Sequence, residues 1–530
     1  MKTALISVYN KEGIADFAKE LSDLGWQIIS SGGTAKVLSE AGVTVQDVAE
    51  LVGGGAILGH RVVTLSREVH AGLLATDSKE DTEELKKLNI PRIDLVCVDL
   101  YPLKEEIAKK NSTTESVIEK TDIGGPTMLR SAAKARRIVI AGPEDRKKVI
   151  EWLKAGEPEK EKFITELVAK SEKVVADYCL SSARYHSEGG YEGMVGGKVL
   201  ECRYGENGYQ KPAALFSTDS GDPLSLDKFE LVAGAAPSYN NLCDVDRLLQ
   251  TITHIAEGFK VGRGKVPKIA VAVKHGNPCG AAIGEDSIEV IQKTIKGDPR
   301  AIFGGLVMTN FPVTEEIAEE LLSFEMPKGQ RRLLDGIIAP SFDKKAMAIL
   351  GRKGDKCRFL ANPALSDLSI DNAPRLRYVR GGFLRQPNYT FVMDFKSSDL
   401  EKNGKVSESQ EDDMLLAWAI GSTSNSNTVT LVKDKMLIGN GVGQQDRVGG
   451  CQLAIHRAKS AGHKIKGAAA YSDSFFPFVD GPEELAKAGI SAILSSSGSV
   501  KDDDVKKFCA KNNIGLYLIP DALGRGFFGH

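Results

Sequence analysis

Short apolar runs alternate with amphipathic stretches along the chain, beginning with an apolar run at residues 3–8. Residues 11–25 carry apolar side chains at the spacing i, i+3, i+4, i+7, and the pattern stops at a glycine, as amphipathic helices often do. These apolar positions are Ile14, Phe17, Ala18 and Leu21. Residues 26–29 and 93–100 are again short and apolar, so they are expected to be strands. The pattern therefore predicts strands and helices in alternation.

The apolar run with the clearest chemical ending is Ile269 to Val273, which stops at Lys274 and His275 and is followed by Gly-Asn-Pro. A β-branched run of this length predicts a buried strand. Ligands of open α/β sheets bind where such strands end. Histidine is the side chain best suited to proton transfer near neutral pH, and a neighbouring lysine charge favours its neutral, proton-accepting form. The alternative is a partly buried histidine beside a solvated lysine.

A second candidate site follows the strand at residues 26–29, in the sequence Ser-Ser-Gly-Gly-Thr at residues 30–34. Glycines allow close approach of the backbone, hydroxyls donate hydrogen bonds, and the helix expected from Ala35 would favour an anion at its N-terminus. The spacing differs from that of a P-loop. This stretch predicts a phosphate cradle, with a plain glycine-rich turn as the alternative.

Residues 121–134 combine Asp122 and two glycines with an expected helix that places Arg130 and Lys134 four residues apart on one face. Two cations at this spacing can hold one phosphate or carbonyl group, although an exposed helix face explains the same pattern. The segments 79–87, 157–162 and 401–413 carry charges of both signs, and we expect them to be solvated surface or loops.

Composition excludes several classes of protein. The chain has 530 residues, 42% of them hydrophobic and 26% charged, which predicts two to four globular domains. A formal net charge of −2 argues against a general nucleic-acid binder. No apolar run approaches a membrane span, and the N-terminus lacks the pattern of a signal peptide. The eight scattered cysteines suit reduced thiols, so we expect a cytoplasmic enzyme.

No metal site is predicted from these residues. Pro278 and Cys279 match half of the Pro-Cys-x-x-Cys element of zinc deaminases, but the second cysteine and the His-x-Glu element are missing. The glycine-rich patch at residues 189–198 is the expected domain boundary.

Nine motifs in order resemble those of the bifunctional purine-biosynthesis enzymes that join phosphoribosylaminoimidazolecarboxamide (AICAR) formyltransferase to IMP cyclohydrolase. In sequence order the motifs are SSGGTAK, DLYP, DIGGPTMLRSAAK, RYGEN, SYNNLCD, VKHGNPCGAA, FGG, GQQDR and SDSFFPF. The resemblance implies an α/β protein with a methylglyoxal-synthase-like cyclohydrolase domain at residues 1–197. It implies a transformylase domain at residues 198–530 made of two cytidine-deaminase-like subdomains, split near residue 370. It also implies a homodimer in which the transformylase site is shared across the interface.

For the first reaction, the resemblance implies formyl transfer from 10-formyltetrahydrofolate, a co-substrate, to AICAR, giving FAICAR. His275 matches the base, Lys274 the residue that assists it, and Asn427 the residue that hydrogen-bonds the transfer centre. Further residues match or resemble binding positions for the nucleotide or the folate: Arg203, Tyr204, Asn240, Asp335, Phe476 and Arg525. His530 is a second C-terminal candidate for a nucleotide contact.

For the second reaction, the resemblance implies that the carboxamide nitrogen of FAICAR attacks its own formyl group and water leaves, giving IMP. Both reacting groups lie on one ring, so proximity supplies much of the rate. Tyr101, Asp122 and Lys134 match the residues assigned to this step. The expected phosphate and substrate contacts are Ser31, Gly32, Thr34, Lys36, Arg61 and Thr64.

Several positions depart from the family pattern, namely Ala135, Gly208, Tyr209 and the C-terminal GRGFFGH, and the largest departure lies in the cyclohydrolase segment. Where the family reads Arg-Val-Lys-Thr-Leu-His-Pro, residues 61–67 place Val63 at the lysine and end in Ser66 and Arg67. Arg67 is a candidate to replace the lost charge. We expect retained cyclohydrolase activity, and the alternatives are a transformylase with an impaired first domain or a nucleotide-binding regulator without turnover. The intact Lys274 and His275 argue against the regulator.

Overall fold

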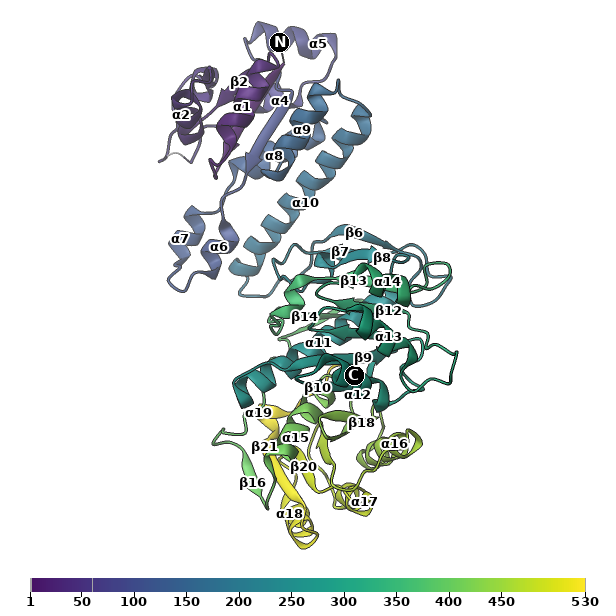
Figure 1. The fold of residues 1–530 in the computed structure, drawn as a ribbon. Helices are drawn as coiled ribbons and strands as arrows, with labels where there is room; N and C mark the ends of the chain where they lie inside the picture. The colour runs from purple at the N-terminus through teal and green to yellow at the C-terminus, as the bar shows by residue number, and fades with distance from the viewer. Residues whose placement is uncertain (1, 60, 530) are drawn as a thin grey trace. The chain divides into compact units, whose positions relative to one another are not determined.

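The computed structural model describes residues 2–59 and 61–529, and the chain divides into two units, Met1–Gly197 and Lys198–His530 (Figure 1). Each unit has its own sheet and its own apolar core. No helix in the described part of the chain is long and apolar enough to cross a membrane. His530, a candidate nucleotide contact, lies outside the described residues.

The first unit is built on a five-stranded parallel sheet in the order β3-β2-β1-β4-β5. Its strands are β1 Thr3–Val8, β2 Gln27–Ser30, β3 Val45–Asp47, β4 Leu95–Asp99 and β5 Ile138–Ile140. The central strands are apolar on both faces because helices cover both sides of a parallel sheet. Since all five strands are parallel, their carboxyl ends meet at one edge.

The helices of the first unit include the expected amphipathic one, whose four apolar positions are all buried. They are α1 Ile14–Asp23, α2 Gly32–Glu40, α3 Val48–Leu51, α4 Arg67–Leu74, α5 Lys79–Lys87, α6 Leu103–Ala108, α7 Thr114–Glu119, α8 Gly124–Lys134, α9 Glu144–Lys154 and α10 Lys160–His186.

One local expectation in the first unit needs correction, whereas a second, that residues 79–87 are solvated surface, is confirmed. The helix after the Ser-Ser-Gly-Gly-Thr motif begins at Gly32 rather than Ala35, with Ser31 as its N-cap residue. Both glycines therefore lie in the first helical turn. The charged segment 79–87 is the helix α5, capped by the Ser78 hydroxyl and anchored by the buried Leu85. One apolar anchor among charged residues is too weak a periodic signal to reveal a helix.

The second unit contains a twelve-stranded mixed sheet in the order β16-β21-β20-β19-β17-β18-β10-β9-β11-β12-β13-β8. Two separate two-stranded sheets, β6-β7 and β14-β15, accompany it. The strands are β6 Gly197–Cys202, β7 Ala213–Ser217, β8 Glu230–Ala233, β9 Lys268–Lys274, β10 Asn277–Gly284, β11 Leu306–Thr309, β12 Gly336–Ala339, β13 Arg358–Ala361, β14 Arg375–Val379, β15 Gly382–Gln386, β16 Glu401–Asn403, β17 Val429–Lys433, β18 Met436–Gly441, β19 Ala469–Ser472, β20 Ala492–Ser497 and β21 Gly515–Pro520.

This large sheet is built from the same arrangement twice. In the first half a long helix precedes the hairpin β9-β10, and the parallel strands β11, β12 and β13 follow; in the second half the hairpin is β17-β18 and the strands are β19, β20 and β21. The two halves meet where β10 pairs with β18. The helices are α11 Tyr239–Arg263, α12 Ser287–Gly297, α13 Glu315–Ser323, α14 Lys344–Leu350, α15 Glu408–Gly421, α16 Arg447–Ser460, α17 Asp480–Ala488, α18 Asp502–Lys511 and α19 Asp521–Gly524.

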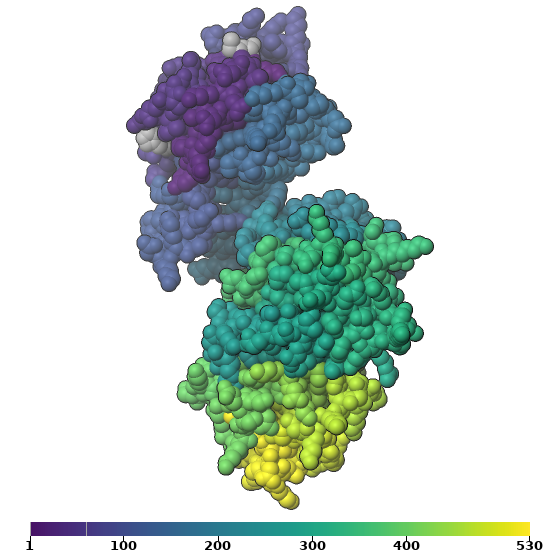
Figure 2. All heavy atoms as spheres, in the orientation of Figure 1, coloured from purple at the N-terminus to yellow at the C-terminus, as the bar shows by residue number. Residues whose placement is uncertain are grey.

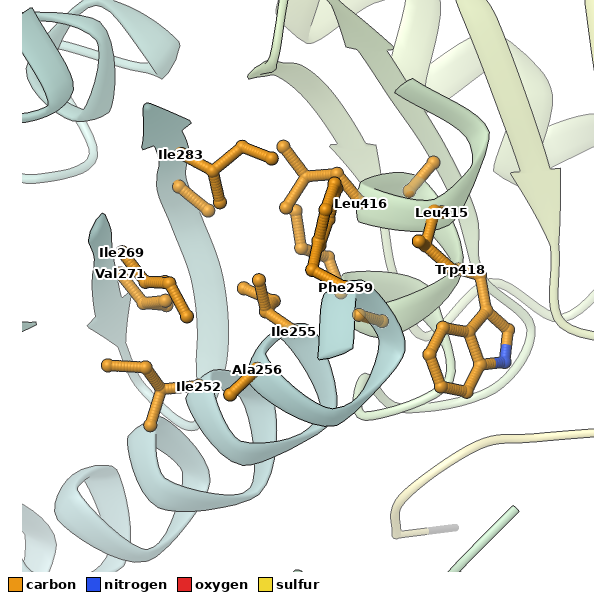
Figure 3. Packing of buried hydrophobic residues seen from close by; sticks show 14 of the residues in the cluster. Ile252, Ile255, Ala256, Phe259, Ile269, Val271, Ile283, Leu415, Leu416 and Trp418 are labelled. Atoms are coloured by element: carbon orange, nitrogen blue, oxygen red, sulfur yellow. The ribbon is translucent and has the colours of Figure 1, made fainter. Parts of the chain in front are cut away.

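The two halves share one apolar core. Helix α11 packs against α15 and against the β9-β10 hairpin, whereas α15 packs against β17 and β19; the residues labelled in Figure 3 belong to this core. Trp418 of α15 is fully buried in this cluster. In the space-filling view the teal-to-green and light-green-to-yellow halves of the second unit form one continuous body (Figure 2). The shared core makes the two halves one folding unit.

Residues 401–413 were expected to be solvated surface or loops, and this expectation is wrong for the last two residues of the segment. Asp412 and Asp413 are buried in α15. The Asp413 carboxylate accepts hydrogen bonds from the backbone N–H groups of Asp434, at 3.0 Å, and Lys435, at 2.7 Å, in the turn between β17 and β18. A buried carboxylate needs such donors, and sequence spacing does not reveal them.

Candidate active sites

Lys274 and His275 lie at a tight hairpin turn between the antiparallel strands β9 and β10. Lys274 pairs with Asn277, so His275 and Gly276 are the two turn residues. Both have positive φ, 54° and 71°, the conformation that a two-residue type I′ turn requires. A left-handed histidine is uncommon and often marks a functional position. The Lys274 ammonium group donates to the Phe303 carbonyl at 2.7 Å, which fixes its direction.

The carboxylate of Asp244, a residue of α11, stabilises this turn. It accepts a hydrogen bond from the Gly276 N–H at 2.6 Å. Burial raises the pKa of Asp244, while the Gly276 N–H and the nearby His275 act in the opposite direction. The contact connects the long helix of the first half to the histidine-bearing turn.

A cavity of about 370 Å³ opens beside the turn, with Lys274 and His275 among its lining residues. Asp298 and Arg457 add one charge of each sign to the wall, and Asn440 comes from the neighbouring strand β18. The Asn440 amide donates to the Pro278 carbonyl at 3.1 Å and accepts from the Thr430 hydroxyl at 2.8 Å. The cavity thus brings the candidate base together with polar groups from both halves.

Asn427 is held by a polar network at the end of α15. Its side-chain amide donates to the Gln444 carbonyl at 2.9 Å, and its side-chain oxygen accepts from Arg447 at 2.9 Å. Arg447 also pairs with the buried Asp473, whose other oxygen accepts from the Thr428 N–H at 3.1 Å. Buried charges of this kind are stable when paired and hydrogen-bonded. The Asn427 amide therefore has a fixed orientation.

Two expected nucleotide contacts lie in the loop after β6. Arg203 is exposed and Tyr204 is half-buried. Asn240, exposed in the first turn of α11, donates to the Glu206 carbonyl of this loop at 3.1 Å. The structure thus brings Asn240 and the Arg203 loop together.

The remaining expected folate and nucleotide contacts have different surroundings. Asp335, just before β12, accepts a hydrogen bond from Arg352 at 2.7 Å. Arg525 lies 3.7 Å from Asp521 and remains partly exposed. Phe476 is 2% exposed and packs in an apolar cluster, so it does not form a wall of an open site. Of the three phenylalanines in the motif, Phe476 is buried, Phe475 is partly exposed and Phe478 is 59% exposed.

In the first unit, candidate residues gather at the carboxyl edge of the parallel sheet. Thr34 is buried, and its hydroxyl donates to the Val8 carbonyl at 3.1 Å at the end of β1. Ser31 caps α2, and Gly32 has a φ of 51°. A Cβ on Gly33 would lie 3.8 Å from Lys11, which brings a lysine to this helix terminus. Free N–H groups at such a terminus favour a phosphate.

Tyr101 and Asp122 lie at the same edge. Tyr101 follows β4 and packs against Tyr9, which follows β1, with ring centres 5.4 Å apart. The Asp122 carboxylate accepts from the Gly125 N–H at 2.8 Å, and its own N–H donates to the Tyr178 hydroxyl at 2.6 Å. Burial raises the pKa of Asp122. Burial and the Asp122 charge raise the pKa of Tyr101, whereas Lys120 lowers it.

Lys134 is placed away from this pair. Asp122 precedes the N-terminus of α8, and Lys134 is the last residue of that eleven-residue helix. At a rise of 1.5 Å per residue, the two ends of α8 are about 15 Å apart. Lys134 is exposed. The structure therefore does not bring Lys134 to Tyr101 and Asp122 as the resemblance implies.

Residues 61–67, the segment that departs most from the family pattern, lie within the described part of the first unit. Thr64 is buried and lies against Gly124, because a Cβ there would come within 2.8 Å of its hydroxyl. Val63 packs against the apolar core of the unit. Arg67 is exposed and pairs with Glu68 at 3.2 Å, and this ion pair does not direct it toward Tyr101 or Asp122.

Two further expected binding cations have acidic neighbours. Arg61 pairs with Glu119 at the end of α7. Lys36 lies 3.9 Å from Glu40 on the exposed face of α2. Both side chains are largely exposed, so these pairs contribute little to stability and leave the cations accessible.

Sequence reasoning did not select several residues of these sites. Asp244 lies in the SYNNLCD motif, so its motif was an available signal. Arg447 lies in the GQQDR motif in the same way. Asn440, Tyr9 and Lys120 had no signal of their own, because only the fold brings them to the candidate residues. Among the described residues, no group of three His, Cys, Asp or Glu side chains is arranged to hold a metal ion.

Comparisons with known proteins match both units. Residues 132–457 match a family model described as the AICARFT/IMPCHase bienzyme, and residues 13–127 match the MGS-like domain. The bifunctional purine biosynthesis protein PurH of Anoxybacillus flavithermus is 38% identical over 514 residues, which cover 95% of this chain and 95% of that protein. PurH of Bacillus cytotoxicus is 37% identical over 516 residues, 96% of each chain. A crystal structure of ForH, 32% identical, covers 36% of this chain and 100% of that one with a TM-score of 0.33.

Proposed function

The chain belongs to the AICARFT/IMPCHase bienzyme family, and from this membership we propose that each unit carries one of the two reactions. The protein is an AICAR formyltransferase and an IMP cyclohydrolase of purine biosynthesis. We assign formyl transfer to residues 198–530 and ring closure to residues 1–197. The observation that carries the assignment is the His275 turn, which lies beside a cavity in the second unit.

In formyl transfer, the amine of AICAR attacks the formyl carbon of the donor. The new C–N bond forms as the bond from the formyl carbon to the donor nitrogen breaks, and the amine proton ends on that nitrogen. We propose that the His275 imidazole takes this proton as attack proceeds. We propose that Lys274, which donates to the Phe303 carbonyl, and the Asn427 amide, which donates to the Gln444 carbonyl, stabilise the oxyanion.

Two polar networks, one at the His275 turn and one at Asn427, support this assignment. Asp244 holds the turn in its left-handed conformation through the Gly276 N–H. Arg447 and Gln444 fix the Asn427 amide from the other half of the unit. Preorganised groups of this kind lose little free energy on reorganisation during the reaction.

In ring closure, the carboxamide nitrogen of FAICAR attacks the formyl carbon on the same ring. One proton from the carboxamide and one from the formamido nitrogen leave with the formyl oxygen as water. We propose that Tyr101 and Asp122 handle these protons, and that the N-terminus of α2 with Ser31, Gly32 and Thr34 binds the phosphate. Lys134 matches the family motif but lies at the far end of α8, so we propose no direct contact with the reacting atoms for it.

The formyl donor is proposed to be 10-formyltetrahydrofolate, as the family's activity implies. Phe475 and Asp335 are the candidate contacts for its ring system. The substrates and products AICAR, FAICAR and IMP are small molecules. We propose no nucleic-acid partner, because the net charge of −2 provides no excess of cations.

We also propose a homodimer located in the cytoplasm. The β14-β15 hairpin supports the first point, because it carries the exposed side chains of Tyr378 and Leu384, 82% and 61% accessible, which suit an interface. All eight cysteines are free, as expected in a reducing compartment.

Replacing His275 by alanine tests whether formyl transfer and ring closure take place at separate sites. The H275A variant should lose formyl transfer from 10-formyltetrahydrofolate to AICAR by at least about 100-fold, because its base is removed. Cyclisation of supplied FAICAR should continue at the wild-type rate. Parallel assays of one protein preparation measure both. An equal fall in both activities would contradict two separate sites.

A further inference from the structure

The ring-closing site lacks the lysine that the family pattern places at position 63, so we searched the site for another cation. Val63 packs on the apolar core and Arg67 pairs with Glu68 in solvent. Lys134 lies at the far end of α8. Lys11 donates to the backbone carbonyls of Val8 and Tyr9. None of these four positions directs a cation at the Tyr101 ring.

The ammonium group of Lys120 lies beside the Tyr101 ring. Lys120 follows α7 and lies two residues before Asp122. Its ammonium nitrogen is 5.0 Å from the centre of the Tyr9 ring and 6.0 Å from the centre of the Tyr101 ring. The same nitrogen donates to the Tyr9 hydroxyl at 3.3 Å. Cations within about 6 Å of an aromatic ring are attracted to its face, so the two tyrosines hold the lysine between α7 and the sheet edge.

The backbone of Lys120 is fixed as well. Its carbonyl accepts a hydrogen bond from the Tyr178 hydroxyl at 3.1 Å, and the same hydroxyl accepts from the Asp122 N–H at 2.6 Å. Tyr178 of α10 therefore sets the positions of Lys120 and Asp122 together. Two carboxylates near Lys120 have other cationic partners, since Glu119 pairs with Arg61 and Glu106 pairs with Lys109.

We propose that Lys120 is a catalytic residue of ring closure and supplies the positive charge that Val63 cannot. Its ammonium group stabilises the negative charge that develops on the formyl oxygen as the carboxamide nitrogen attacks. Tyr9 is a positioning residue, because it holds Lys120 by a hydrogen bond and by its ring face. This inference rests on the proposed assignment of ring closure to the first unit.

The charged and titratable groups around Tyr101 agree with this role. Asp122 and Asp99 provide negative charge from the α7-α8 connection and from β4, and Tyr9 and Tyr178 provide hydroxyl groups from the sheet edge and from α10. Lys120 opposes the effect of Asp122 on Tyr101, since it lowers the pKa of that phenol while Asp122 raises it. Lys120 is therefore electrostatically coupled to the residue that handles protons in this site.

The test compares K120M with K120R and with K86M, which removes an exposed lysine of α5 in the same unit. Cyclisation of FAICAR should fall about 100-fold in kcat for K120M, the loss typical of one oxyanion-stabilising group. K120R should recover most of the rate because it keeps the charge, and K86M should match the wild type. Formyl transfer to AICAR should be unchanged in all three variants.

A pH profile separates a catalytic role from a structural one. In K120M the alkaline limb of kcat for ring closure should move to higher pH, because Tyr101 loses its neighbouring positive charge. K120M with wild-type cyclisation and an unmoved pH profile would overturn the role of Lys120 alone. A wild-type chain that fails to cyclise FAICAR would overturn the assignment of ring closure to this protein, and this inference with it.

Discussion

At the scale of single residues, function depends on side chains that the backbone holds in unusual conformations. His275 and Gly276 both adopt positive φ in the turn between β9 and β10. Asp244 accepts from the Gly276 N–H and so stabilises the turn that presents the histidine. The Lys-His-Gly-Asn sequence predicted the turn, which the structure shows, and the catalytic role of His275 stays a prediction. The part played by Asp244 was not predictable, because it depends on how α11 packs against β9.

Gly276 offers a direct test of this backbone constraint. Gly276→Ala should lower the free energy of unfolding by about 1 kcal/mol, because an L side chain is disfavoured in the left-handed region. Gly276→Asn should cost less, since asparagine tolerates that region. Chemical unfolding curves measure both, and formyl-transfer rates should fall in the same order. Equal losses for the two variants would show that the positive φ is not the constraint.

Two neighbouring phenylalanines show where residue-level prediction fails. The SDSFFPF motif predicted an aromatic wall, and Phe476 was selected for it. In the structure Phe476 is buried in an apolar cluster and Phe475 is partly exposed. The two residues are adjacent after β19 and differ in burial, and Phe478 of the same motif is 59% exposed. Sequence alone carries no signal for this difference between two identical side chains.

At the scale of elements, the two hairpins of the large sheet are held in the same way. Asp244 is the sixth residue of α11 and accepts from the turn of β9-β10. Asp413 is the sixth residue of α15 and accepts from the turn of β17-β18. Each long helix therefore fixes its hairpin through one buried carboxylate. The apolar run at residues 269–273 predicted the strand β9. Asp413, in contrast, lies in the segment 401–413, which was expected to be solvated.

Asp413 makes stability depend on pH. Burial raises the pKa of Asp413 to about 6, despite the two backbone N–H donors. A carboxyl whose pKa is higher in the folded state binds its proton more tightly there. Its contribution to stability is therefore greatest below about pH 4 and is lost as the pH rises through about 6.

Asp413→Asn should flatten this dependence. The amide does not titrate, so the change in unfolding free energy between pH 4 and pH 6.5 should be smaller than in the wild type by on the order of 2 kcal/mol. Urea unfolding at several pH values measures the difference. Parallel pH profiles for the wild type and D413N would rule out Asp413 as the titrating group.

At the scale of the whole molecule, the chain combines two units with different sheets. The first is an all-parallel sheet with candidate residues at its carboxyl edge, and the second is a twelve-stranded mixed sheet built from a repeated arrangement. The alternating pattern predicted β1, β2, β4 and α1 of the first unit, whereas β3, β5 and the 27-residue helix α10 were not predicted. The repeat in the second unit was not visible as a sequence repeat, because the halves share the order of elements rather than residues. The resemblance to a known family was needed to divide it.

The central claim is that the first unit closes the ring without a lysine at position 63. The measurement that tests it most directly is the addition of the purified full chain to FAICAR alone, with IMP formation followed by absorbance. We predict IMP formation far above the uncatalysed rate, and the same rate in the H275A variant, because Tyr101, Asp122 and Lys120 complete the site. Normal formyl transfer to AICAR without IMP formation would contradict the claim and leave a transformylase with an inactive first unit.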